Sequence, residues 1–352
     1  MDQFKIIKRA LETTWRYRAL WLFGALVALT AGGRNGGGGG GSNVSLPGPE
    51  SQFPGIDVPG PPVWLILVVI GAIILLALIF GVLSAIVRYV SGNALIQMVN
   101  EREETGTEVG IKRGFRMGWS RAAWRFFLID LVLYLPAISL FIVGLLISAA
   151  PLLLWVTRRQ VLGIVGTVVT IGLFFLLLLI SIGASIVLNL LRHFFLRQAA
   201  LEDAPVFNAI KEGFGLVRRH LGDVALMGLL MFGLGIVYTV VTLPVFVLLL
   251  IAALIAGGSA GVLVGGLASL VFQGAVPWIV GGLTALPLFI IIVGLPGLFI
   301  SGVYEVFKST SWTLTFRELT ALDAVLMAEK KEEEEKETAA AKEKDQEDDR
   351  EM

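Results

Sequence analysis

Long apolar runs dominate this chain and restrict what it can fold into. Most of them exceed the roughly 20 residues that an α-helix, rising about 1.5 Å per residue, needs to cross a bilayer. With 56% hydrophobic residues, 16% charged residues and a mean hydropathy of +0.81, the chain is far too apolar for a soluble domain. The sequence therefore predicts an all-α, polytopic transmembrane helical bundle of about six spans, at residues 17–31, 63–90, 122–156, 161–191, 224–256 and 279–303.

The connections between these runs alternate in charge. Lysine and arginine cluster before the first run, between the second and third, and between the fourth and fifth. The connections on the other side carry Arg34, then Arg158 with Arg159, and then no basic residue. Because short basic connections stay in the cytoplasm, six spans place both the N-terminus and the C-terminus there.

The span count depends most on residues 224–303, which contain no Asp, Glu, Lys or Arg. This stretch has room for a third helix, and an odd count would move the C-terminus outside. The glycine-rich segment 261–273 is too short to span a bilayer, so we interpret it as a re-entrant or interfacial piece. An extra span within 257–278 is the alternative.

Two segments differ from the apolar body. Residues 32–62 contain a run of six glycines at 36–41 and scattered prolines, which predicts a flexible external loop. Residues 324–352 form a charged tail, helical or disordered, after a transmembrane domain at 1–323. The tail is expected to be a solubilising cytoplasmic end, with docking of a basic partner as the alternative.

A short sequence pattern recurs three times at a spacing near one hundred residues. Each copy belongs to an amphipathic stretch that runs into a span, and the first stretch has its apolar residues at Phe4, Ile7, Leu11 and Trp15. Such a helix lies in the membrane interface. The sequence thus predicts three pairs of spans, each preceded by an amphipathic interfacial helix, in units of about 4–103, 109–203 and 206–323. The three copies are Ile7-Lys8-Arg9-Ala10-Leu11, Ile111-Lys112-Arg113-Gly114-Phe115 and Ile210-Lys211-Glu212-Gly213-Phe214.

Basic residues accompany each of these stretches. Lysine and arginine in an interfacial helix lie at the level of the lipid phosphates. The candidate lipid-headgroup contacts are Lys8, Arg9, Arg16, Arg18, Lys112, Arg113, Arg121, Lys211, Arg218 and Arg219.

The repeated entry helix and the segment Trp15-Arg16-Tyr17-Arg18-Ala19-Leu20-Trp21-Leu22-Phe23-Gly24 carry a resemblance. The chain resembles a broad group of prokaryotic six-span membrane proteins, which includes the membrane domain attached to some glycerophosphoryl diester phosphodiesterases. The resemblance covers most of residues 1–323 and implies a multi-pass protein of a prokaryotic cell membrane. It does not extend to catalysis, because no stretch of this chain encodes the phosphodiesterase catalytic domain.

Asp130 is the best candidate for a functional polar group inside a span. It lies eight residues past the start of the third run, about 12 Å along a helix, where a charge is costly unless it is paired or hydrated. One interpretation makes Asp130 a proton or coupling-ion site with Tyr134; the other pairs it with Arg125 or Arg88. Asn189, in the fourth run, is expected to bond between helices or to line a path.

No catalytic, cofactor-binding or metal-binding set is recognisable. The chain has no cysteine and two histidines, and its glycine run lacks the lysine and hydroxyl residue of a phosphate-binding loop. The sequence favours a non-enzymatic membrane component that organises lipids or proteins, without a cofactor. Its expected partners are the lipid bilayer and membrane or cytoplasmic proteins, and no nucleic acid. The alternative is a transporter or channel for a small solute or ion, with Asp130 as its polar site.

Overall fold

The computed structural model describes residues 2–31, 63–157 and 159–351. The predicted external loop 32–62 and Arg158 lie outside the described residues. The described chain is helical and contains no strand, which confirms the all-α prediction. In order, the helices are α1 (Gln3–Arg16), α2 (Ala19–Ala31), α3 (Val63–Thr105), α4 (Ile111–Gly118), α5 (Arg121–Ala149), a 3₁₀ segment (Ala150–Thr157), α6 (Gln160–Leu201), α7 (Val206–Arg219), α8 (Leu221–Ser269), α9 (Val276–Phe289), a π-helical turn (Ile290–Gly294) and α10 (Leu295–Glu351).

Five helical stretches among the described residues are long and apolar enough to cross a membrane. The first predicted span corresponds to α2, which has 13 residues and is therefore about 20 Å long. That is shorter than the roughly 30 Å hydrocarbon core of a bilayer. A sixth crossing and the pairing of spans therefore stay predictions. The five stretches are Leu67–Thr105, Arg121–Thr157, Gln160–Leu201, Leu221–Ser269 and Val276–Glu329.

The interpretation of residues 261–273 as a separate re-entrant piece is wrong. Helix α8 continues through this segment to Ser269, and a turn then leads into α9. The glycines serve close packing: a Cβ on Gly261 would lie 2.9 Å from the carbonyl oxygen of Gly281, and one on Gly265 would lie 2.9 Å from that of Pro277. In membrane helices, small residues four apart allow two backbones to approach in this way.

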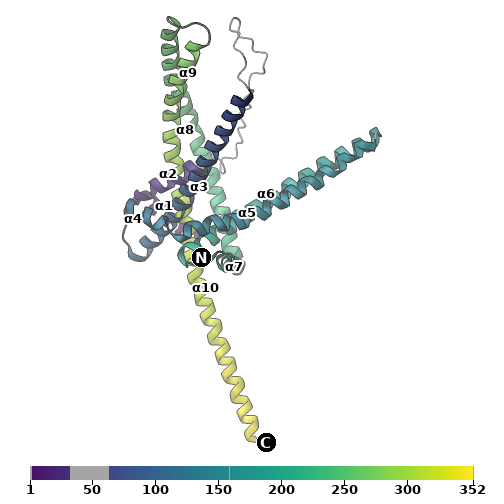
Figure 1. Cartoon of the computed structure of the whole chain (residues 1–352). Coiled ribbons are helices and arrows are strands. Elements are labelled where there is room, and N and C mark those ends of the chain that lie inside the picture. Colours follow the sequence, from purple (N-terminus) through teal and green to yellow (C-terminus); the bar gives the residue numbers. More distant parts are fainter. Residues whose placement is uncertain (1, 32–62, 158, 352) are drawn as a thin grey trace.

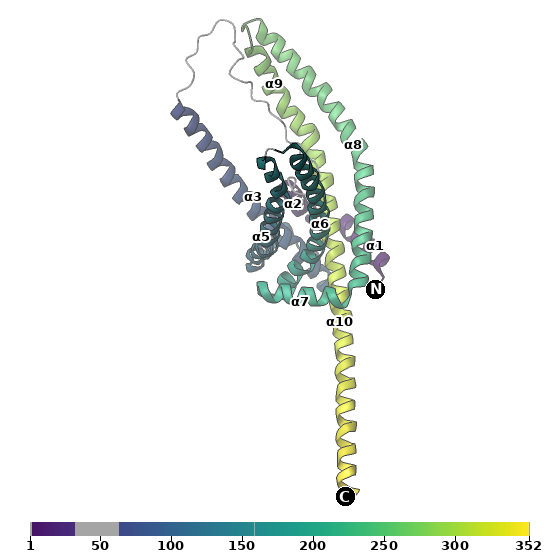
Figure 2. The ribbon, with the colours of Figure 1, turned by 90° about the vertical axis from the view of Figure 1, so that its right-hand side faces the viewer.

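The long helices converge at one end and diverge at the other. Figure 1 shows α5 and α6 leaving the centre as one hairpin and α8 with α9 as another. Figure 2 shows α3 leaning away from α8 and α9. Along the diverging parts, large apolar side chains are exposed, as they are on Ile73, Phe175 and Leu248. We call the convergent end the core end, because the buried parts of α3, α6 and α10 lie there.

Residues 306–319 of α10 form the centre of the core end. They contact α1, α2, α3, α6 and α7, and most of their side chains are buried, including Trp312 and Phe316. Several of the intervening hydroxyls bond back to the helix, as Ser311 does to the carbonyl oxygen of Phe307 (2.9 Å) and Thr315 to that of Ser311 (2.8 Å), whereas the buried Thr310 hydroxyl has no partner among the described residues. The last predicted span ends at residue 303, so the burial of this segment is not predicted by hydropathy.

Three short helices surround the core end, and each packs on a long helix. Helix α4 packs on α3, α7 packs on α6, and α1 packs on α10. Small residues make these contacts: Ala10 is fully buried, and a Cβ on Gly114 or Gly213 would collide with Met98 or Phe195, respectively. Beyond the core end, α10 continues without a break to Glu351, so the predicted tail is helical (Figure 1).

Candidate functional site

Asp130 lies at the core end of α5 and is 4% exposed. Its carboxylate accepts hydrogen bonds from Arg192 Nε (2.5 Å) and Nη2 (2.8 Å) on α6, and from the Tyr89 hydroxyl (3.0 Å) on α3. The bidentate pair with Arg192 compensates both charges, as a buried ion pair requires. Asp130 therefore ties α3, α5 and α6 together.

The partner of Asp130 differs from the prediction. Arg125, one of the two expected partners, instead donates to Asp203 between α6 and α7. Arg88, the other, lines a cavity next to this cluster. Arg192 is the partner because α5 and α6 form a hairpin about residue 159, and residues 130 and 192 lie at similar distances from its turn. Counting outward from that turn would have identified the pair.

Tyr134 and Asn189 also connect α5 to α6. The Tyr134 hydroxyl donates to Asn189 Oδ1 (3.2 Å), and Asn189 Nδ2 donates to the carbonyl oxygen of Ser185 (2.8 Å). The expected hydrogen bond of Asn189 between helices is thus present. A role of Asp130, Tyr134 and Asn189 in ion or solute movement stays a prediction.

A cavity of about 430 Å³ lies beside this cluster, between α2, α3, α5, α6 and α10. We call it the basic cavity, because Arg88, Arg192, Arg197 and Lys308 line it. The only carboxylate among its described lining residues is Glu305, which lies 3.8 Å from Lys308 Nζ. Even with Asp130 behind Arg192, cations outnumber carboxylates here.

Arg197 is the least compensated cation of the basic cavity. It is 2% exposed and donates to three neutral oxygens: the carbonyl oxygens of His193 (2.7 Å) and Ser309 (2.9 Å), and Thr313 Oγ1 (3.2 Å). No carboxylate of the described residues lies within ion-pair distance of its guanidinium. Arg197 and Lys308 are not recognisable as site residues in the sequence, because both follow apolar runs, where basic residues ordinarily indicate only the topology.

The ten predicted headgroup residues are all exposed and lie on or beside α1, α4 and α7. Three of them also bond to carboxylates of neighbouring long helices: Arg9 to Glu103 (2.5 Å), Arg113 to Glu101 (2.6 Å) and Arg219 to Asp323 (2.7 Å). These three therefore fasten the short helices to the core end. Contact of the ten residues with lipid phosphates stays a prediction.

The apolar residues of the short helices divide between two faces. Phe4, Leu11 and Trp15 of α1 are exposed, as are Ile111 and Phe115 of α4 and Phe207 and Phe214 of α7. Val217 of α7 follows Phe207 and Phe214 at helical spacing, but it is buried against the core. Since α7 uses that face to pack on the bundle, its exposed stripe is narrower than expected.

Comparison with known proteins places the chain in a protein family. A family model matches residues 1–316, which run from α1 to the buried segment of α10. The chain belongs to the family of unknown function DUF7544. No curated protein matches the chain, and no solved structure matches it. Because the function of the family is unknown, membership assigns no activity to this site. The resemblance to phosphodiesterase membrane domains stays a prediction.

Proposed function

We propose that this protein is a non-enzymatic component of a prokaryotic cell membrane, that it organises lipids at the cytoplasmic face, and that both of its termini lie in the cytoplasm. One observation carries the proposal: α1, α4 and α7 expose large aromatic side chains at the core end. Phe4 and Trp15 are 75% and 69% exposed, and Phe207 is 76% exposed. Such side chains are unfavourable in water and favourable at the boundary of headgroups and acyl chains.

The charges beside these aromatics support the same placement. Each short helix carries exposed lysine or arginine next to its exposed aromatic residues. A basic residue near an anionic membrane surface contributes about 1 kcal/mol of binding free energy. The three helices together then gather anionic lipid around the core end, which the proposal places in the cytoplasmic leaflet.

Six crossings in three pairs complete the proposed topology. Helix α2 acts as the sixth crossing, since a span of about 20 Å is accommodated by local thinning of the bilayer. An even number of crossings then returns α10 to the side of α1, in agreement with the packing of α1 on α10. The positive core end agrees with cytoplasmic placement.

The test is lipid analysis of the protein extracted from cells with its surrounding lipid. Lys8, Lys112 and Lys211 occupy matching positions of the three short helices and are exposed, so we choose the triple variant Lys8→Glu, Lys112→Glu, Lys211→Glu. We expect the wild type to retain anionic lipid and the variant to lose that enrichment. The control, Lys331→Glu with Lys336→Glu, reverses lysine charges in the tail and should retain the lipid. Equal lipid content in all three proteins contradicts the proposal.

A transporter or channel for a small solute or ion is the second candidate, favoured by the polar lining of the basic cavity beside Asp130. Its test is flux of ions and small anions into proteoliposomes. Flux through the wild type that Asp130→Asn abolishes, with the protein still folded, would support this candidate. Equal flux in the wild type and in Asp130→Asn would show that Asp130 has no role in transport.

A further inference from the structure

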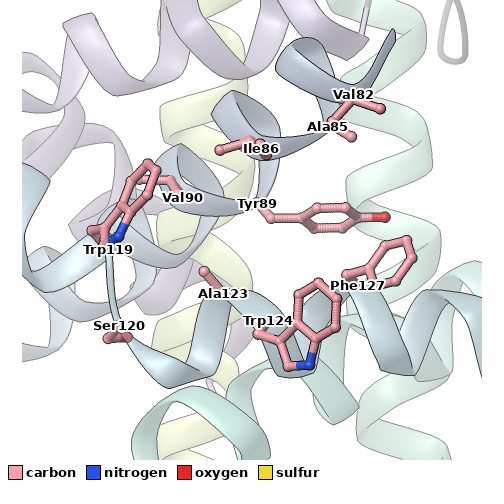
Figure 3. Close-up of a pocket in the computed structure, with 10 residues that line it drawn as sticks. All are labelled: Val82, Ala85, Ile86, Tyr89, Val90, Trp119, Ser120, Ala123, Trp124 and Phe127. Carbon is pink, nitrogen blue, oxygen red and sulfur yellow. The ribbon is translucent and has the colours of Figure 1, made fainter. Parts of the chain in front are cut away.

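A second cavity opens next to the basic cavity, and the two share one wall residue, Tyr89. The second has a volume of about 490 Å³ and lies between α3 and the start of α5. We call it the aromatic groove. Figure 3 shows the ring of Tyr89 between Ala85 and Ile86 on one side and Trp124 and Phe127 on the other. The Tyr89 and Phe127 rings meet edge to face, with their centroids 6.0 Å apart.

The two cavities offer opposite chemistry on either side of Tyr89. The aromatic groove is lined almost entirely by apolar groups, and the side chains of Trp119 and Trp124 at its rim are 62% and 64% exposed. The groove is therefore open to whatever surrounds the helices, which for these apolar spans is lipid. On its other side, the Tyr89 hydroxyl donates to Asp130, which holds Arg192 at the wall of the basic cavity.

The basic cavity has the donors that an anion needs. Arg197 is buried without a carboxylate partner among the described residues, although burying an uncompensated guanidinium costs several kcal/mol. Arginine presents a fork of N–H donors that matches phosphate oxygens, and Lys308, which lies 3.8 Å from Glu305, adds a second positive charge to the lining of the same cavity. A phosphate group between Arg197 and Lys308 would supply the missing counter-charge.

We infer that the two cavities form one binding site for a single anionic phospholipid, with its phosphate in the basic cavity and an acyl chain in the aromatic groove. The inference rests on the proposed function, because it names the lipid class that the protein holds. Charge complementarity selects the anionic headgroup, and the adjoining apolar groove selects a lipid over free phosphate. Tyr89 lies where headgroup and chain join, so its position fixes the lipid between α3 and α5.

The experiment measures binding by the purified full-length protein in a neutral detergent. Phosphatidylglycerol, phosphatidylcholine, glycerol phosphate and inorganic phosphate are each titrated, with dissociation constants from native mass spectrometry and the shift in Tm as a second readout. We expect phosphatidylglycerol to bind at least about tenfold more tightly than the other three. Binding of glycerol phosphate or inorganic phosphate as tight as that of phosphatidylglycerol would show a site for free phosphate and overturn the inference.

Two variants test the halves of the site separately. Lys308→Gln removes a charge from the basic cavity, and Ala85→Trp fills the aromatic groove without changing any charge. Each should weaken phosphatidylglycerol about tenfold or more. The matched controls are Lys331→Gln in the tail and Ala77→Trp, which lies two turns earlier in α3 at an exposed position. Unchanged binding in Ala85→Trp, with a Tm equal to that of Ala77→Trp, would overturn the inference.

The failure of this site and the failure of the proposed function give different results. If the lipid-organising proposal holds and the site does not, the wild type retains anionic lipid on extraction and the triple lysine variant loses it, while Lys308→Gln and Ala85→Trp bind phosphatidylglycerol normally. If the proposed function fails, the triple lysine variant retains as much anionic lipid as the wild type. The triple lysine variant could retain all its anionic lipid while Ala85→Trp loses tight binding of phosphatidylglycerol. That result would support the binding site and contradict the proposed organisation of lipids around the short helices.

Discussion

Tyr17 and Val109 exchange two hydrogen bonds across 92 residues of chain. The Tyr17 hydroxyl donates to the carbonyl oxygen of Val109 (2.6 Å) and accepts from its amide N–H (2.7 Å). Tyr17, the residue between α1 and α2, is 1% exposed, and Val109, just before α4, is 5% exposed. One phenol therefore satisfies both backbone groups of a residue that belongs to neither a helix nor a strand.

Tyr17→Phe should destabilise the protein by about 1–3 kcal/mol. The substitution leaves the carbonyl and the amide of Val109 buried without partners, and an unsatisfied buried polar group carries a desolvation cost. Thermal unfolding in detergent measures the effect. The control is Tyr238→Phe, which removes a 3.4 Å hydrogen bond to Ser301 and should have a smaller effect. Equal Tm values for the two variants would show that the pair of bonds to Val109 contributes no more than the single long bond to Ser301.

The same residue predicts a dependence on alkaline pH. Burial raises the pKa of the Tyr17 phenol above its ordinary value of 10.0. The unfolded chain then ionises first, so the stability that Tyr17 contributes is complete below about pH 10 and declines as the pH rises further. The difference in unfolding free energy between wild type and Tyr17→Phe should therefore shrink as the pH rises from about 10 to about 11. A difference that stays constant over this range contradicts the assignment.

Asp130→Asn should cost about 3–5 kcal/mol, because it leaves the buried guanidinium of Arg192 without its counter-charge. The double variant Asp130→Asn with Arg192→Gln should recover part of the loss. Asp203→Asn is the control, since Asp203 is 85% exposed at its side chain and its pair with Arg125 is worth less than about 1 kcal/mol. Chemical unfolding in mixed micelles compares the variants. A double variant less stable than Asp130→Asn alone would show that Arg192 does not need Asp130.

Adjacent glycines in α8 provide a test of the α8–α9 packing. A side chain at Gly265 meets the carbonyl oxygen of Pro277 at 2.9 Å, whereas a Cβ at Gly266 meets nothing within 4 Å. Gly265→Leu should lower stability by about 1–3 kcal/mol through overpacking. Gly266→Leu should be neutral or slightly stabilising, since replacing glycine favours a helix. Thermal unfolding of the two variants decides, and the opposite ranking would mean that α8 presents another face to α9.

The absence of cysteine makes the topology directly measurable by single-cysteine labelling. Gln273, in the turn between α8 and α9, and Thr107, between α3 and α4, are both exposed. In intact cells, an impermeant maleimide should label Gln273→Cys and leave Thr107→Cys unlabelled until the membrane is opened. Labelling of Thr107→Cys in intact cells would place the core end outside.

Hydropathy was sufficient to predict most of the long helices, because lipid-exposed helices need only apolar side chains and a minimum length. The three short helices were also predictable, since the stripe of Phe4, Leu11 and Trp15 has helical spacing and stays exposed. The core end was less visible in the sequence. Residues 306–319 are rich in serine and threonine, and their burial depends on neighbours hundreds of residues away.

Contacts between distant helices limited the prediction of the site. The burial of Asp130 could be anticipated from the sequence, but its choice of Arg192 depends on how the α5–α6 hairpin aligns its two helices. The burial of Arg197 could not be predicted from hydropathy, because a charged residue after an apolar run usually marks the end of a span. The wrong prediction of a re-entrant segment at 261–273 has a related reason. Its glycines suggested a break in the helix, whereas their role is to allow α9 to pack closely against α8.

The packing of α1 on α10 also has a consequence for biosynthesis. A ribosome makes α1 roughly 300 residues before the segment of α10 that it contacts. During that interval the nascent chain lacks the α10 part of the cluster that buries Ile6 and Ala10 in the finished fold. The bilayer surface, which α1 meets through Phe4 and Trp15, is then the available shelter, and the bundle closes only when the last long helix has been inserted.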